Sequence, residues 1–236
     1  MKKFRKIILI LVPLVFLAMS TPAEIQTQKN SPVENVVKIP SASGSPINGA
    51  FYGNGRNVVI LSNMDPNDVE SWAPIIPELV AQKLSVISYE YNRSGTDRLK
   101  DLIEVLDFAQ SQGFSKIILI GACRGGVISI QAAANNNSNA GIVAVAALAV
   151  PIEYHGTIFY SSEELASISV PKLLINSEGD YSANDTRKIH EAFIEPKAIS
   201  FYSGNEHGTD MFNNPNHKKA LVQQLINFAS LSFQAQ

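Results

Sequence analysis

Residues 117–126 read IILIGACRGG, an apolar run followed directly by a turn of small residues around a cysteine. Gly-x-Cys-x-Gly between a buried strand and a helix has the spacing of a nucleophile elbow, a sharp turn that lifts its central side chain above the sheet. A side chain at the flanking positions would clash with the neighbouring backbone. We therefore predict that Cys123 is a nucleophile and that Gly121, Gly125 and Gly126 make room for the turn. The alternative is a glycine-rich turn around an inert, buried cysteine.

Segments on both sides of this turn alternate between strand and helix patterns. Predicted strands cover 36–39, 47–52, 58–61, 85–91, 117–120, 142–150, 173–175 and 199–202, and predicted helices cover 69–80, 99–109, 127–134, 183–193 and 216–233. The first two strands suggest an antiparallel hairpin. The rest indicate an α/β, doubly wound, mostly parallel sheet of about eight strands with helices on both faces.

The connection over 151–170 is too short for a large cap domain. Its aromatic residues either form a small apolar lid over the site or pack on the sheet: Tyr154, His155, Phe159 and Tyr160.

The chain opens with MKKFRK and then runs apolar from Ile7 to Met19. A basic start, an apolar run and small residues after it predict a secretory signal peptide over 1–23. A polar linker over 24–34 and a single domain over 35–236 follow, and we expect export to the periplasm or the exterior. The apolar run is shorter than the roughly 20 residues that span a bilayer, so no stable membrane insertion is expected after cleavage. An uncleaved N-terminal membrane anchor is the alternative.

Composition excludes several classes of protein. The 236 residues carry a formal net charge of -2, whereas a nucleic-acid-binding domain normally has a basic excess. The single cysteine excludes an intramolecular disulfide framework and a cysteine-based zinc site. These observations favour a globular enzyme.

Two polar residues each follow a predicted strand in the C-terminal half, Asp180 and His207. Hydrolases built on a nucleophile elbow have the chain order nucleophile, acid, histidine. We therefore predict a triad of Cys123, Asp180 and His207, with Glu178 as a rival acid. The remaining histidines fit this order less well: His155, His190 and His217.

The sequence GACRGG with a downstream Asp180 and His207-Gly208 resembles the α/β-hydrolase superfamily. Within it, the cysteine is similar to that of the dienelactone hydrolase family, whose motif is Gly-x-Cys-x-Gly-Gly. The segments 58–72 and 206–210 also resemble small bacterial α/β-hydrolases that usually carry serine at the elbow. The likeness covers most of residues 50–230. It implies an α/β-hydrolase fold and hydrolysis of an ester-type bond without a metal or organic cofactor.

An oxyanion hole needs two backbone donors near the nucleophile. The N–H of Arg124, at the start of a helix, is one candidate. Where the superfamily often has His-Gly, this chain has Asn63, Met64 and Asp65 before a proline. We expect the second donor to be the N–H of Met64 or Asp65, while an ordinary Asp-Pro turn is the alternative.

The expected activity is covalent acyl transfer from a small carboxylic ester, thioester or lactone to Cys123 and then to water. Arg124 either attracts an anionic substrate or is simply solvated. One alternative is a non-catalytic binding protein that keeps the elbow. A thiol redox protein is a weaker alternative because no second cysteine is present to resolve an oxidised Cys123.

Overall fold

The computed structural model describes residues 34–94, 97–135 and 141–234. All of them belong to one compact unit, Ser31–Gln236. The predicted signal peptide and all but the last residue of the predicted linker lie outside the described residues. Within the described ranges, no helix has the length and apolar character needed to cross a membrane.

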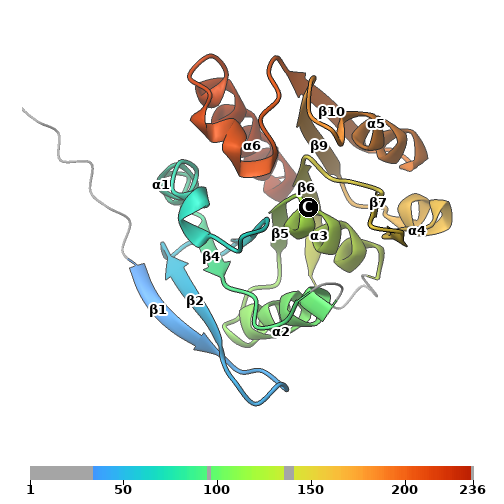
Figure 1. The fold of residues 1–236 in the computed structure, drawn as a ribbon. Coiled ribbons are helices and arrows are strands. Elements are labelled where there is room, and N and C mark those ends of the chain that lie inside the picture. Colours follow the sequence, from blue (N-terminus) through green and yellow to red (C-terminus); the bar gives the residue numbers. More distant parts are fainter. Residues whose placement is uncertain (1–33, 95–96, 136–140, 235–236) are drawn as a thin grey trace, which may run out of the picture. The chain divides into compact units, whose positions relative to one another are not determined.

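Eight strands form one sheet in the order β1-β2-β4-β3-β5-β6-β9-β10 (Figure 1). Their bounds are β1 Glu34–Ile39, β2 Ile47–Tyr52, β3 Val58–Ser62, β4 Ser85–Tyr89, β5 Ile117–Ala122, β6 Ile142–Leu148, β9 Lys172–Ser177 and β10 Lys197–Tyr202. Strand β2 pairs antiparallel with β1 and β4, and every other pair is parallel. The predicted mostly parallel sheet with an N-terminal hairpin is therefore confirmed.

Helices cover both faces of the sheet, as expected. Their bounds are α1 Ile76–Ala81, α2 Arg98–Ser111, α3 Arg124–Ala134, α4 Ser162–Ser167, α5 Ala183–Ala192 and α6 Lys218–Gln234. Alternate strand residues point to opposite faces. In β3, Val58 and Ile60 pack in the core beneath α2 and α3, whereas Val59 and Leu61 pack in the core beneath α1 and α6. Figure 1 shows these two helix pairs on opposite sides of the sheet.

The continuous helix predicted over 69–80 is divided in the structure. A short 3-10 helix occupies Val69–Trp72, and α1 begins only at Ile76. Pro74 lies between them, and proline lacks the N–H that a continuous helix needs. Pro77 is tolerated because it falls in the first turn of α1.

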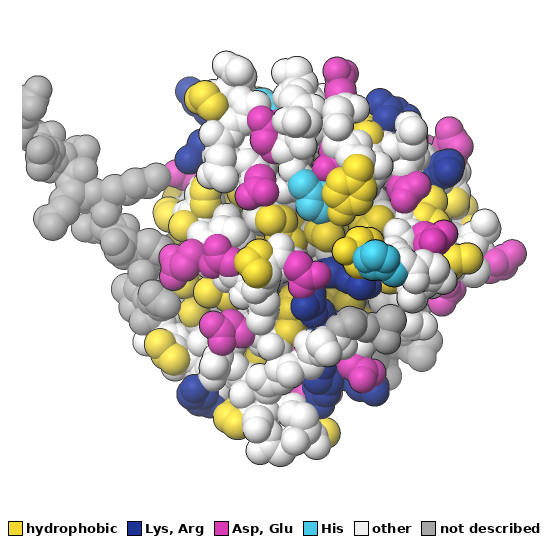
Figure 2. Space-filling view, viewed as in Figure 1, with side chains coloured by type: hydrophobic (Ala, Val, Ile, Leu, Met, Phe, Trp, Pro, Cys, Tyr) yellow, Lys and Arg dark blue, Asp and Glu magenta, His cyan; other side chains and the backbone are white. Residues whose placement is uncertain are grey.

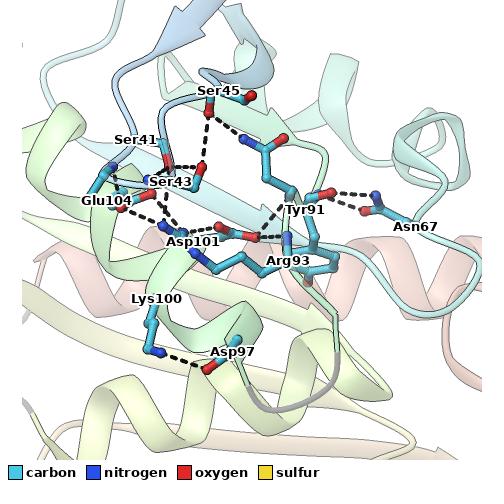
Figure 3. A network of polar contacts seen from close by, with 12 residues as sticks. Ser41, Ser43, Ser45, Asn67, Tyr91, Arg93, Asp97, Lys100, Asp101 and Glu104 are labelled. Carbon is cyan, nitrogen blue, oxygen red and sulfur yellow. Dashed lines mark hydrogen bonds and ion pairs between the residues drawn. The ribbon is translucent and has the colours of Figure 1, made fainter.

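A polar network joins the loop after β4 to α2 and to the turn between β1 and β2 (Figure 3). The guanidinium of Arg93 donates to both carboxylate oxygens of Glu104, at 2.9 and 3.0 Å, and to Asp101. Asp101 is fully buried and also accepts the backbone N–H groups of Asn92 and Arg93, at 2.9 and 2.8 Å. Ser41 lies 3.3 Å from the same guanidinium. The network thus anchors a loop at the carboxyl end of β4.

Candidate active site

Cys123 lies between the end of β5 and the first residue of α3. Its backbone angles are φ 47° and ψ −115°, a region that residues other than glycine rarely occupy. Its N–H donates to Leu148 on the neighbouring strand β6 at 2.8 Å, which holds the strained turn in place. The thiol is free and partly exposed. Arg124 follows as the first helical residue, so its N–H has no partner within the helix.

The glycines around Cys123 are required by close backbone approach. A Cβ on Gly121 would lie 2.2 Å from the carbonyl oxygen of Gly125, and one on Gly125 would lie 2.0 Å from that of Ser62. A Cβ on Gly126 would lie 2.4 Å from a methyl group of Val150. The backbone therefore leaves no room for a side chain at Gly121 or Gly125.

Asp180 and His207 follow the neighbouring strands β9 and β10 and meet above the sheet edge. Nδ1 of His207 donates to Oδ2 of Asp180 at 2.8 Å. The other carboxylate oxygen accepts the backbone N–H and the hydroxyl of Ser182, at 2.7 and 2.5 Å. Asn176, also buried, contacts this oxygen at 3.4 Å and Ser182 at 3.0 Å. The rival acid Glu178 is exposed.

Hydrogen bonding decides the charge state of this pair. Burial raises the pKa of Asp180, but the hydrogen bonds from His207 and Ser182 outweigh it and lower that pKa below 3.8. For His207, burial lowers the pKa, whereas hydrogen bonds with Asp180 and Cys123 raise it to about 9. The structure therefore places Asp180 against His207 and Cys123 near enough to affect the pKa of His207.

The segment after β3 is held from several sides. Asn63 is fully buried, and its carbonyl oxygen accepts the hydroxyl of Tyr91 at 2.9 Å. Its side-chain amide accepts from the indole of Trp72 at 3.0 Å and donates to the carbonyl of Tyr89 at 2.7 Å. These contacts fix the backbone that leads into Met64.

Met64 lies close to the elbow. A Cβ on Gly208 would be 2.8 Å from the sulfur of Met64 and 3.9 Å from the backbone nitrogen of Cys123. The side chain of Asp65 instead forms an ion pair with Arg98 at 2.5 Å. The oxyanion roles of Met64 and Asp65 stay predictions.

A tyrosine that the sequence did not predict lies beside His207. The ring of Tyr181 stacks on that of His207, with centroids 4.7 Å apart and planes 26° apart. Its hydroxyl lies 3.2 Å from Nε2 of His207, although the residue is 68% exposed. Ser182 and Asn176 were missed as well. Their position in the sequence could have indicated them, because Tyr181, Ser182 and Asn176 all lie within four residues of Asp180.

The profile of the dienelactone hydrolase family matches residues 71–229. The chain belongs to this family. No curated protein matches the sequence. Family membership supports an ester-hydrolysing enzyme, and so do the esterases and a lipase among the structural neighbours.

Solved structures resemble this dienelactone hydrolase family member in fold. The esterase domain of a Rhodothermus marinus protein has a TM-score of 0.68 at 15% identity, covering 84% of this chain and 98% of that one. Est1E from Butyrivibrio proteoclasticus has a TM-score of 0.70 at 13% identity, covering 84% and 99%. The enol-lactonase from Burkholderia xenovorans has a TM-score of 0.60 at 14% identity, covering 78% and 97%. At these identities the likeness establishes the fold.

The connection between β6 and β9 divides its aromatic residues between core and surface. Phe159 and Tyr160 are buried in the core cluster that also contains residues of α2 and α3. Tyr154 and His155 lie on the two-stranded hairpin of β7 (Glu153–Tyr154) and β8 (Thr157–Ile158), and Tyr154 is 47% exposed. The guanidinium of Arg124 lies 5.3 and 4.7 Å from the ring centroids of Tyr154 and Phe159. Among its described residues, this family member therefore carries a small hairpin beside the elbow and no large cap.

Histidines on the site face lie against aromatic rings. Besides Tyr181 on His207, Tyr154 contacts His155 with centroids 4.2 Å apart. Figure 2 shows histidine side chains next to exposed hydrophobic ones on this face, with basic side chains below them. Among the described residues, no group of three or more potential metal ligands gathers. Apolar and basic side chains thus lie together on this face.

Proposed function

We propose that this family member hydrolyses small carboxylic esters, thioesters or lactones through an acyl-enzyme on Cys123. The supporting observation is the juxtaposition of a strained, partly exposed cysteine at a helix start with a histidine whose Nδ1 is held by a buried carboxylate. This is the nucleophile, base and orienting group of a catalytic triad.

Acylation begins from the thiolate and the His207 imidazolium. Sulfur attacks the carbonyl carbon, and the negative charge that forms on the carbonyl oxygen is met by backbone N–H groups at Arg124 and at Met64 or Asp65. The C–O bond to the alcohol then breaks, and the proton held on His207 passes to the departing oxygen. Asp180 keeps the imidazole in the required tautomer.

Deacylation reverses these roles. Neutral His207 takes a proton from water, which attacks the thioester carbon. The C–S bond breaks, and the acid product leaves with the thiolate–imidazolium pair restored. No step requires a metal or organic cofactor, and the substrate is a small molecule.

Hydrolysis of p-nitrophenyl acetate and butyrate tests the proposal. Wild type, Cys123→Ala and His207→Ala are compared with His190→Ala, a control histidine in the last turn of α5. We expect both triad variants to lose roughly 10³-fold or more in kcat/KM, with the control unchanged. Mass spectrometry should find the acyl group on Cys123. Undiminished turnover in Cys123→Ala would refute the cysteine nucleophile, and an inactive wild type on esters, thioesters and lactones would favour a binding protein.

We also propose that the protein is exported, with residues 1–23 acting as a cleaved signal peptide. The basis is the basic start and short apolar run of the sequence. N-terminal sequencing of the mature protein from fractionated cells distinguishes cleavage from an N-terminal anchor.

A further inference from the structure

The hydroxyl of Tyr181 lies beside Nε2 of His207, the ring nitrogen that is left to exchange protons with a substrate. Nδ1 is committed to Asp180, so every proton exchanged with substrate must pass through Nε2. The hydroxyl of Tyr181 lies 3.2 Å from that atom, within hydrogen-bonding distance. A group in this position either takes part in proton transfer or has to move aside.

The chemistry of the phenol favours the first possibility. Burial and the negative charges of Cys123 and Asp180 raise the pKa of Tyr181, so the hydroxyl stays protonated and is a donor. Cys123 is close enough to contribute to this pKa shift, so the hydroxyl lies near both reacting side chains. Its ring stacks on the imidazole while one side faces solvent, where an alcohol leaving group would depart.

We propose that Tyr181 is a further catalytic residue, whose hydroxyl accepts a hydrogen bond from Nε2 of His207 and donates one to the oxygen of the departing alcohol. This inference rests on the function proposed above. When the C–O bond breaks, its electron pair stays on the alcohol oxygen and takes the phenol proton. The proton on Nε2 replaces it, which leaves neutral tyrosine, neutral histidine, a thioester and the free alcohol. In deacylation, water gives its proton to the phenol oxygen as the phenol proton returns to Nε2.

The dependence of kcat/KM on the leaving group distinguishes proton donation by Tyr181 from a packing role. p-Nitrophenyl acetate and ethyl acetate share one acyl group, but only ethoxide needs a proton in order to leave. Tyr181→Phe keeps the stacked ring and removes the hydroxyl. We expect it to lower kcat/KM for ethyl acetate by about 10- to 100-fold and to leave kcat/KM for p-nitrophenyl acetate nearly unchanged. Tyr202→Phe is the matched control, because the hydroxyl of Tyr202 donates to Gln224 at 2.8 Å.

A proton inventory in mixtures of light and heavy water gives a second readout. With ethyl acetate, a relay through Tyr181 moves two protons in wild type, so the plot of rate against the deuterium fraction of the solvent is curved. In Tyr181→Phe only one proton moves, and the plot becomes linear. Equal losses on both esters would reassign Tyr181 to packing, and no loss on either would make it a spectator. Either result overturns the inference while the Cys123→Ala and wild-type rates still report on the proposed function. A wild-type protein that hydrolyses neither ester would contradict both this inference and the proposed function.

Discussion

Nδ1 of His207 lies 2.8 Å from Oδ2 of Asp180, although the two residues are 27 positions apart in the chain. Each follows one of two neighbouring parallel strands, β9 and β10, so the sheet itself sets their separation. Backbone contacts between the two loops reinforce it, since Gly179 N donates to the carbonyl of Gly204 at 2.8 Å. These contacts restrict the movement of the two loops, so the imidazole of His207 is oriented before any substrate binds.

Replacing the orienting carboxylate should disable the histidine without removing it. In Asp180→Asn the amide no longer stabilises the imidazolium, and the pKa of His207 should fall from about 9 toward its ordinary value of 6.5. We expect kcat/KM for p-nitrophenyl acetate to fall by roughly 10³- to 10⁴-fold. The measurement is a pH–rate profile beside wild type. An unchanged profile would mean that Asp180 is not the orienting acid, and Glu178→Gln is the matched comparison.

Ser182 should matter through Asp180. Its hydroxyl donates to the carboxylate at 2.5 Å, and the side chain is fully buried. In Ser182→Ala the carboxylate keeps one backbone N–H but loses its shortest donor. We expect about a 10- to 100-fold loss of kcat and about 1–3 kcal/mol less stability. Ser111→Ala, an exposed serine that bonds a helix carbonyl, is the control. Equal effects of the two variants on kcat would contradict this role.

The fold was predictable because each buried strand contains a short apolar run between turn residues. The main difference between prediction and structure is the division of 69–80 into two short helices. It depends on Pro74, whose effect cannot be read from the spacing of apolar residues alone. The hairpin over 153–158 escaped notice because its strands have two residues each and are exposed. Such a segment has no apolar pattern to detect.

Chain order predicts the proposed triad residues, but it does not predict the residues that support them. Tyr181 has no motif, and its relation to His207 arises only when β10 brings a distant loop against it. Asn63 likewise reads as an ordinary turn residue. Its burial among Trp72, Tyr89 and Tyr91 depends on strands that pair far apart in sequence.

The elbow should not tolerate even one added methyl group. In Gly125→Ala the new Cβ would lie 2.0 Å from the backbone carbonyl of Ser62, which has no side-chain freedom to yield. We expect a loss of about 3 kcal/mol in unfolding free energy, measured by urea titration. Gly113→Ala is the comparison, since its Cβ meets nothing and only its φ of 90° is unfavourable, for about 1 kcal/mol. A loss in Gly125→Ala no larger than that in Gly113→Ala would show that the turn yields to the added methyl group and that this contact does not limit it.

The Arg93 network should contribute more to stability than an exposed ion pair. Arg93→Gln leaves the fully buried carboxylate of Asp101 without its cation (Figure 3). We expect Tm to fall by roughly 5 °C or more. Lys100→Gln, which breaks the exposed pair with Asp97, should lower Tm by no more than about 2 °C. Calorimetry of both variants checks this, and equal shifts would mean that the buried pair adds nothing beyond a surface one.

The imidazolium of His207 should make stability depend on pH in a defined window. Its pKa is raised in the folded protein from 6.5 to about 9, so the folded state binds this proton more tightly than the unfolded state does. The resulting stabilisation is fully present below pH 6.5, declines as pH rises, and is lost once pH passes about 9. Urea unfolding of wild type and His207→Gln across this range measures it. The difference in unfolding free energy should favour wild type most at the acid end of the window and shrink steadily toward the alkaline end. A difference that does not change with pH would mean that His207 is neutral in the folded enzyme, and the thiolate–imidazolium starting state would have to be abandoned.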